Sequence, residues 1–163
     1  MRPILYLAGA GLLSIIGTSW IASAAGDSAG EFIALTRAAL DRWGKGDIQG
    51  LLDLYAPDVT YFDPVQEKRV DGIEAMRRIY APFAGKLKIG HYEMIDPKVQ
   101  RYGEVAILTF NLVDDVVQRP DGPGNVRVPW NCTQVYARIQ GKWKVVSEHW
   151  SFIKPEPKTT PVR

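Results

Sequence analysis

The stretch TQVYARIQGKWKVVSEHWS, residues 133–151, decides how the fold is read, because it holds two strands and the turn between them. Valine, tyrosine and tryptophan favour strands, and the Gln-Gly pair between them suits a tight hairpin turn. In the second strand a period of two groups five side chains on one face: Trp143, Val145, Ser147, His149 and Ser151. The other face then carries Lys144, Val146, Glu148 and Trp150. We therefore expect the chain to end in an antiparallel hairpin.

Other strands precede this hairpin. Residues 91–101 and 104–113 are rich in β-forming residues and flank a Tyr-Gly pair, which predicts another hairpin. The run RPDGPGN at 119–125 predicts a loop before the strand at 126–139. The second half of the chain is therefore expected to form an antiparallel meander.

The first half shows helical spacing instead. Apolar residues recur every three or four positions over 32–43, and again over 48–55, where Pro57 stops the pattern. A short strand is expected at 59–63, and the sequence DGIE at 71–74 predicts the start of a third helix. Helices followed by a meander predict an α+β fold, in which a curved antiparallel sheet wraps around the N-terminal helices.

The N-terminus has the layout of a secretory signal peptide. Arg2 precedes a mostly apolar run over 4–16, and Ala-Ser-Ala at 22–24 supplies a cleavage site, so residues 1–24 form the predicted leader. A membrane anchor is the alternative, but the run is shorter than the roughly 20 apolar residues that span a bilayer. We expect export to the periplasm or the outside of the cell, with no membrane attachment after cleavage. The mature protein would hold a domain over 28–154 and a flexible tail over 155–163.

The composition excludes several classes of protein. The chain has 163 residues, enough for one domain, and only one of its 20 basic and none of its 18 acidic residues falls in the leader. The mature protein is therefore nearly neutral, and no nucleic-acid partner is expected. Cys132 is the only cysteine, which excludes an intrachain disulfide, and it is expected to be a small core residue. With two His residues and no HxH or HExxH spacing, no metal site and no cofactor are expected.

Several segments resemble the nuclear transport factor two-like superfamily, which includes the SnoaL-like and ketosteroid isomerase-like domains. The segments GDIQGLLDLYAPDVTYFDP at 46–64 and GIEAMRRIYAPF at 72–83 are similar to the start of ketosteroid isomerases. PKVQRYGEVAILTF at 97–110 is similar to the central hairpin of the family. The stretch 133–151 is similar to the last strands of SnoaL-like proteins and of the calcium/calmodulin-dependent protein kinase II association domain. The resemblance implies a cone, a cystatin-like α+β roll, whose apolar pocket holds one small apolar or amphipathic molecule per subunit.

Asp63 stands where ketosteroid isomerases have their general base, also as Asp-Pro after a short strand. Burial beside Tyr61 and Phe62 would raise the pKa of this carboxyl group and suit it to proton exchange. The alternative is a turn, in which the Asp63 side chain accepts hydrogen bonds from nearby backbone N–H groups. Both interpretations stay open at this point.

His149 is the second candidate, because the HxS pattern at 149–151 matches relatives in which this strand face lines the cone. Its imidazole titrates near neutral pH and could act as acid, base or donor, whereas the alternative is a strand histidine held by a hydrogen bond. We predict that Asp63 and His149 form a catalytic pair. The remaining pocket lining is predicted to be Tyr55, Tyr61, Tyr80, Phe110, Trp130, Thr133 and Ser151, with ordinary core packing as the alternative for each aromatic residue.

Other polar positions argue against the known steroid isomerase mechanism. The positions that match the oxyanion donors of that enzyme hold Ala39 and either Thr133 or Val135, so its oxyanion hole is not expected. His91 is expected at a rim or on the surface. Three loop carboxylates are expected to be solvated: Asp114, Asp115 and Asp121.

Two classes of function follow. The first is an enzyme of isomerase, lyase or cyclase type that uses the Asp63 and His149 pair. The second is a non-catalytic module for ligand binding or assembly. The resemblance also implies a homodimer, formed through an apolar outer sheet face that we expect to carry Tyr136, Trp150 and Phe152.

Overall fold

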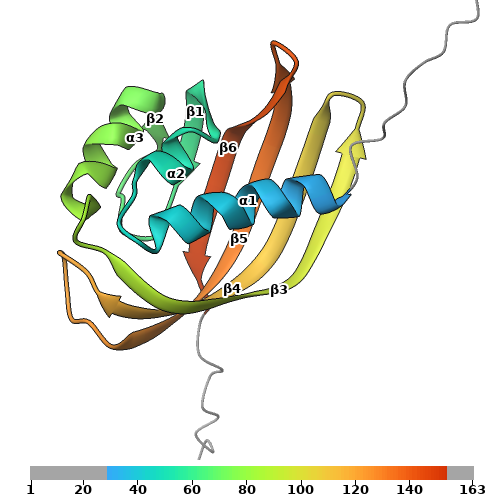
Figure 1. Cartoon of the computed structure of the whole chain (residues 1–163). Coiled ribbons are helices and arrows are strands. Elements are labelled where there is room, and N and C mark those ends of the chain that lie inside the picture. The colour runs from blue at the N-terminus through green and yellow to red at the C-terminus, as the bar shows by residue number, and fades with distance from the viewer. Residues whose placement is uncertain (1–28, 154–163) are drawn as a thin grey trace, which may run out of the picture.

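A curved six-stranded sheet holds three helices on its concave side in the computed structural model, which describes residues 29–153 (Figure 1). The helices are α1 (Ala29–Trp43), α2 (Gln49–Leu52) and α3 (Ile73–Tyr80), followed by the short 3-10 helix η1 (Ala81–Phe83). The strands are β1 (Tyr55–Phe62), β2 (Val70–Asp71), β3 (Lys88–Tyr102), β4 (Val105–Gln118), β5 (Val126–Ile139) and β6 (Lys142–Phe152). The leader predicted over 1–24 and the tail predicted over 155–163 lie outside the described residues.

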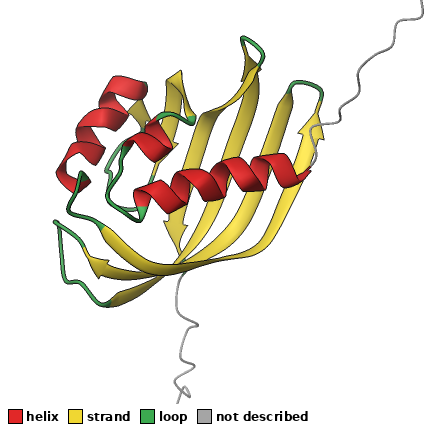
Figure 2. Cartoon of the chain, viewed as in Figure 1, coloured by secondary structure: helices red, strands yellow, loops and turns green. Residues whose placement is uncertain are grey.

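The sheet order is β2-β1-β6-β5-β4-β3. Strands β3 to β6 form the expected antiparallel meander, and Figure 2 shows that the helices cover only one face of it. The α+β prediction is confirmed, with one correction to the expected antiparallel sheet. Strand β1 pairs with β6 in parallel, so that Tyr61 lies opposite Glu148 and Phe62 opposite His149. Parallel neighbours need a long connection, and here residues 63–141 separate the two strands.

Helix α1 supplies the central part of the core. Its buried side chains, at helical spacing, are Phe32, Thr36, Ala39 and Leu40. The Phe32 ring packs edge-on against Tyr136 and Trp143, with ring centroids 5.2 and 4.9 Å apart. Because α1 crosses the concave side of the sheet, its apolar stripe faces strands β5 and β6 (Figure 1).

Helix α2 is shorter than the sequence predicts. It ends at Leu52, and Tyr55 and Pro57 belong to strand β1 instead of to the predicted helix over 48–55 and its end. The helix lies close against α1 because Gly50 has no side chain. A Cβ atom at Gly50 would come within 2.5 Å of the Arg42 Cβ and 2.7 Å of the Ala39 carbonyl oxygen. This close approach brings the chain into the sheet after a single helical turn.

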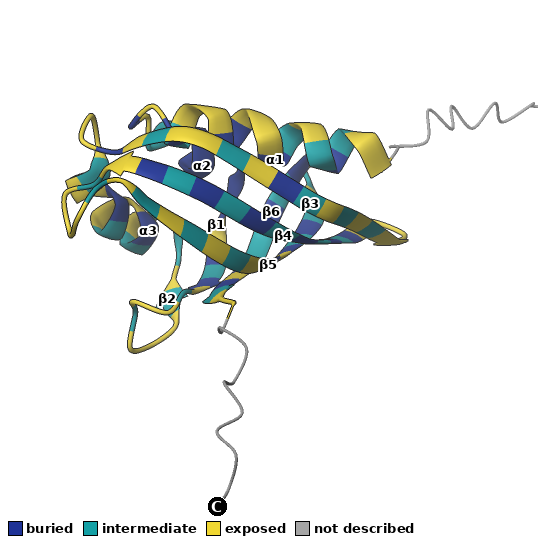
Figure 3. Ribbon diagram, turned by 90° about the horizontal axis from the view of Figure 1, so that it is seen from below, coloured by how far each residue is buried: buried dark blue, intermediate teal, exposed yellow. Residues whose placement is uncertain are grey.

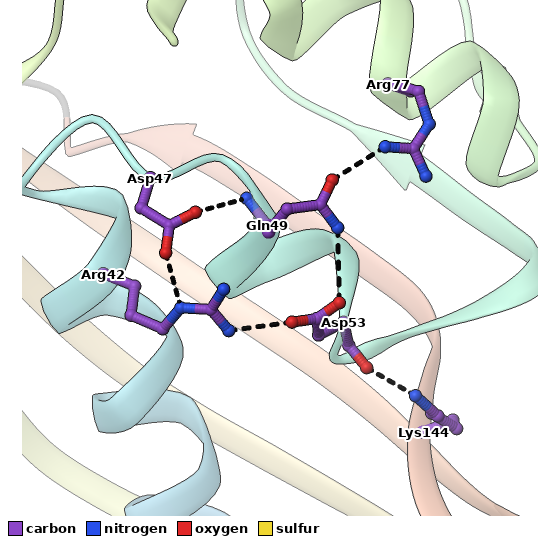
Figure 4. A network of polar contacts seen from close by, with 6 residues as sticks. All are labelled: Arg42, Asp47, Gln49, Asp53, Arg77 and Lys144. Atoms are coloured by element: carbon purple, nitrogen blue, oxygen red, sulfur yellow. Dashed lines mark hydrogen bonds and ion pairs between the residues drawn. The ribbon is translucent and has the colours of Figure 1, made fainter. Parts of the chain in front are cut away.

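A network of polar contacts on the surface ties the helices to the sheet (Figure 4). Arg42 at the end of α1 donates to Asp47 at 2.7 Å and to Asp53 at 2.8 Å. Gln49 links this group to α3, because it donates to Asp53 and accepts from Arg77 at 2.7 Å. The Lys144 ammonium group of β6 donates to the Asp53 carbonyl oxygen. The network thereby fixes the corner where the chain passes from helix to strand.

Strand β6 changes which side chains face the core partway along its length. Val145 lies opposite Tyr136, but Ser147 already lies opposite Val135, so β6 accommodates one extra residue at Val146. Such a bulge reverses the alternation of side chains beyond it. In strand β4 the alternation continues without interruption, as the bands of buried and half-buried residues in Figure 3 show.

Candidate functional site

A pocket of about 170 Å³ opens between the helices and the inner face of the sheet. Its volume is more than ten times what a single water molecule requires. Aromatic side chains from seven different elements make up much of its wall: Trp43, Tyr61, Tyr80, Phe83, Tyr92, Trp130, Trp150 and Phe152. The pocket is therefore shaped for a largely apolar molecule.

Four charged side chains also line this pocket: Asp63, Asp114, Arg119 and Asp121. Two of them pair with each other, because the Arg119 guanidinium donates to both carboxylate oxygens of Asp121, at 2.7 and 2.8 Å. Asp63 and Asp114 are the two carboxylates left without such a bidentate partner. Both therefore need separate consideration.

Asp114 is the most deeply buried of these carboxylates, with 7% of its surface exposed. On strand β4 it is an even number of positions from Phe110, Leu112 and Val116, so it shares their face of the strand, and these three residues are also buried. The Trp130 indole N–H donates to Asp114 Oδ1 at 3.2 Å. Burial raises the pKa of Asp114 to about 6, although the hydrogen bond from Trp130 opposes the shift. The expectation that Asp114 is solvated is wrong, because the strand continues beyond its predicted end at 113 and turns this side chain inward.

Asp63 follows strand β1 and lies half-buried in the pocket wall. Its Oδ1 accepts hydrogen bonds from the backbone N–H groups of Val65 and Gln66, at 2.7 and 3.0 Å. These bonds are the ones that the turn interpretation predicts. Asp63 thus organises the turn at the pocket wall, and its carboxylate also contributes negative charge there.

His149 does not lie in the pocket. Its side chain is exposed and packs beside Phe62, with ring centroids 5.9 Å apart. Because of the bulge in β6, Glu148 and Trp150 point inward, so His149 between them points to the outer face. The prediction that His149 lines the cone beside Asp63 is therefore wrong, and the structure does not bring the two side chains together.

The other predicted lining residues divide into three groups. Tyr61, Tyr80 and Trp130 line the pocket, as expected. Tyr55 and Phe110 are buried in the core outside the pocket lining. Thr133 is exposed and lies opposite His149, and Ser151 lies opposite Asn131, from which it accepts a weak hydrogen bond at 3.4 Å. The placement of Ser151 in the pocket is wrong for the same reason as that of His149. The placement of Thr133 is wrong because Cys132 and Gln134, its neighbours on β5, are the residues that point inward.

A buried polar network beneath the pocket was not expected from the sequence. Its centre is Glu148, which is 1% exposed and accepts hydrogen bonds from the Tyr55 hydroxyl and, at 2.5 Å, from the Gln134 amide. The Tyr55 hydroxyl also bonds that of Tyr80 at 2.9 Å, which joins the network to the pocket wall. Burial raises the pKa values of Glu148 and of both tyrosines. The signal was present in the sequence, since a Glu two positions from Trp150 shares its strand face.

The far side of this network fixes the orientation of Gln134. The Gln134 side-chain carbonyl accepts from Thr36 at 2.7 Å and from Tyr136 at 3.1 Å, which leaves its amide nitrogen directed at Glu148. Tyr136 is completely buried here, and Trp150, 8% exposed, packs between Phe110 and Trp130. The prediction that Tyr136 and Trp150 lie on the outer dimerisation face is therefore wrong. Phe152 is 46% exposed but also lines the pocket, beside Trp130, so its placement on the outer face is wrong as well.

Within residues 29–153, no helix is long and apolar enough to cross a membrane. In the same range, no three His, Cys, Asp or Glu side chains gather in a way that could hold a metal ion. Cys132 is buried, as expected for a core residue, and burial raises the pKa of its thiol well above the ordinary value.

Solved structures with this fold include a candidate ketosteroid isomerase from Parabacteroides distasonis, which is 34% identical. That match covers 77% of this chain and 87% of the other, with a TM-score of 0.64. The association domain of the calcium/calmodulin-dependent kinase II of C. elegans is 24% identical, over 75% and 93% of the two chains, with a TM-score of 0.62. An NTF2-like protein of unknown function from Pseudomonas putida is 22% identical, over 78% and 88%, with a TM-score of 0.64.

Among curated proteins, none matches the chain. The family model of the SnoaL-like domain matches residues 33–155, which is most of the chain and includes the pocket, strand β6 and the buried network. The resemblance that the sequence motifs indicated is thereby confirmed. The chain belongs to the SnoaL-like domain family within the NTF2-like superfamily.

Proposed function

We propose that this protein binds a small, largely apolar molecule in its pocket and that Asp114 exchanges a proton with that molecule, in chemistry of the isomerase or lyase type. One observation carries the proposal: a buried carboxyl group with a pKa of about 6 lies beside aromatic side chains in the wall of the pocket. A base is most effective when its pKa is near the working pH, and an ordinary Asp at about 3.9 is too acidic.

Other groups of the pocket support proton exchange. The hydroxyl groups of Tyr61 and Tyr80 have pKa values raised by burial, so they remain neutral in the pocket wall. Asp63 is a second candidate for proton exchange, because it lies in the same wall. The proposed site does not include His149.

The steroid isomerase mechanism itself is not part of the proposal. Ala39, at the position that matches the tyrosine donor of that enzyme, is buried in the core and has no polar atom in its side chain. Thr133 points to the outer face of the sheet, away from the pocket. Neither position therefore supplies a donor for an oxyanion in the pocket.

Any small molecule that co-purifies with the protein provides a test of the proposal. Mass spectrometry identifies that molecule. Incubation of the molecule with the protein in D₂O then measures how fast the carbon-bound protons of the molecule are exchanged for deuterium. We expect wild-type protein and His149→Ala to exchange alike, and Asp114→Asn to be slower by roughly 10² or more. Asp115→Asn is the matched control, since Asp115 is the exposed neighbour of Asp114 on the same strand. Equal rates for Asp114→Asn and wild type would exclude Asp114 as the base.

Assembly is a second candidate function, because the association domains of calcium/calmodulin-dependent kinase II share this fold. We infer that the outer sheet face forms a homodimer. Half-buried apolar residues of this face, Ile107, Val113 and Val135, alternate with the polar residues Thr109, Asn111 and Thr133. Such a mixture of apolar and hydrogen-bonding groups is ordinary for interfaces between subunits.

We also propose that the protein is exported. The N-terminal leader predicted over 1–24 supports this, with its apolar run and its small-residue cleavage site. The intact mass of the protein recovered from the periplasm or the medium would decide it. We expect a mature chain that begins close to residue 25, and a full-length chain in those fractions would contradict cleavage.

A further inference from the structure

Asp114 lacks the positive partner that a buried carboxylate ordinarily has. Charged residues this deep are almost always paired, because removal from water penalises an isolated charge. Within residues 29–153, none of the ion pairs includes Asp114. Its one side-chain donor is the uncharged Trp130 indole, at a rather long 3.2 Å. The side chain is thus more than nine-tenths buried, lines the pocket and is left without a cation.

The one cation in the pocket wall, Arg119, forms its ion pair with a residue other than Asp114. Arg119 holds Asp121 with two short hydrogen bonds, and this bidentate pair leaves its charge largely neutralised. The remaining charged members of the wall, Asp63 and Asp114, are both negative. The pocket therefore carries an excess of negative charge at neutral pH.

The aromatic walls, like this negative charge, favour a positively charged ligand. An aromatic face attracts a cation within about 6 Å of its ring centre, most strongly when both are removed from water. Trp130 contacts both Trp150 and Phe152, with ring centroids 5.9 and 4.6 Å apart, so Asp114 is hydrogen-bonded to one member of an aromatic cluster. A carboxylate beside clustered aromatic rings suits an ammonium group better than a neutral or anionic one.

We propose that the ligand of this pocket is a small amphipathic organic cation, whose positive nitrogen pairs with Asp114 and whose apolar part fills the aromatic walls. This inference rests on the proposed function, because it names the ligand class of the same pocket. It is compatible with proton exchange, since a positive nitrogen makes a neighbouring C–H bond more acidic and so easier for Asp114 to deprotonate.

The pH dependence of binding follows from the ionisation of Asp114. Its pKa of about 6 means that the carboxyl group is ionised at pH 7.5 and protonated at pH 5, and only the ionised form attracts a cation. Asp115 and Arg119 are the charged neighbours that act on it, and Asp63 and Asp121 share its pocket. The two histidines, His91 and His149, are exposed and line no part of this pocket.

Three probes of similar shape test the ligand class: phenyltrimethylammonium, its neutral isostere tert-butylbenzene, and the anion benzenesulfonate. Their dissociation constants are measured by NMR titration of the indole N–H signals, since Trp43, Trp130 and Trp150 line the pocket. We expect the cation to bind at least 10-fold more tightly than the neutral probe at pH 7.5, and its advantage to shrink about 10-fold at pH 5. Asp114→Asn should remove the advantage of the cation and leave the neutral probe within about 3-fold, and Asp115→Asn should change neither.

The possible failures can be told apart. Equal binding of the cation and the neutral probe, or tighter binding of the anion, overturns the ligand class and leaves the proposed pocket intact. Binding of the cation that persists in Asp114→Asn, or that is independent of pH in wild type, overturns the role of Asp114. Absence of binding for all three probes counts against both the ligand class and the proposed function.

Discussion

At the residue scale, Asp114 combines a functional position with a cost to stability. Its pKa in the folded protein is about 6, compared with 3.8 for an ordinary Asp, because burial disfavours the charge. The folded protein therefore holds this proton more tightly than the unfolded chain does. The contribution of Asp114 to stability is complete below about pH 4 and is lost as the pH rises through about 6.

Replacing Asp114 with Asn should therefore stabilise the protein at high pH only. We expect the free energy of unfolding to rise by about 1–3 kcal/mol at pH 8 and to change little at pH 4, since one pKa unit corresponds to about 1.4 kcal/mol. Urea unfolding between pH 4 and pH 8 measures this difference. Asp115→Asn removes an exposed contact with Arg127 at 3.4 Å and a charge that is among the smaller causes of the Asp114 shift, so it should stay within about 0.5 kcal/mol at both ends. A gain that is independent of pH would contradict the shifted pKa.

Glu148 is expected to matter for folding. In Glu148→Ala the Tyr55 hydroxyl and the Gln134 amide lose their acceptor in the core, which should lower the free energy of unfolding by roughly 3–5 kcal/mol. Glu148→Gln should lose clearly less, because its amide can accept from Gln134 and donate to Tyr55. Urea unfolding at one pH compares the two variants. Equal losses would mean that the hydrogen bonds contribute little and that volume alone matters.

The residues that sequence patterns missed were missed for identifiable reasons. Asp114 continues the buried alternation of Phe110 and Leu112, so the period of two could have placed it inside. It was assigned to solvent because Asp-Asp before a Pro- and Gly-rich run is typical of loops. Glu148 could have been found only by counting back from Trp150, since counting forward from Trp143 gives the opposite face.

At the scale of elements, the bulge in β6 separates what was predictable from what was not. The strands of the second half and the first and third helices follow from periodicity, and their bounds fall within a few residues of the predicted ones, except that β4 continues to Gln118, five residues beyond its predicted end at 113. A bulge depends on how β6 meets both β5 and β1, which no periodicity within one strand reveals. One extra residue turned His149 and Ser151 away from the predicted site and brought Glu148 in.

The contact between α1 and α2 gives a test at the same scale. A Cβ at position 50 would lie 2.5 Å from the Arg42 Cβ, and both atoms are fixed by backbone. Gly50→Ala should therefore lower the free energy of unfolding by about 1–3 kcal/mol. Gly122→Ala is the matched control, because the nearest atoms there belong to the flexible Arg119 side chain, at 3.5 Å or more. Equal melting temperatures for the two variants would show that α2 can shift at no cost.

At the scale of the whole molecule, the outer sheet face is the surface where the dimer prediction now applies. Thr133 lies between Thr109 and His149 on neighbouring strands, so a charge there falls near the middle of the face. We expect Thr133→Arg to halve the mass measured by light scattering, whereas Glu67→Arg, in the exposed loop after β1, should leave it unchanged. A wild-type protein that is already monomeric at high concentration would exclude the interface.

The parallel pairing of β1 with β6 also bears on how the chain acquires its structure. Thr60 and Ser147 meet although 87 positions separate them, and the hydrogen bond between Tyr55 and Glu148 spans 93. Contacts this distant in sequence slow folding, because a long loop must close before they form. The first strand therefore has no lasting neighbour on that edge until the ribosome has made almost the entire domain. The export proposed above would benefit from this order, because the sheet cannot be completed before synthesis is nearly finished.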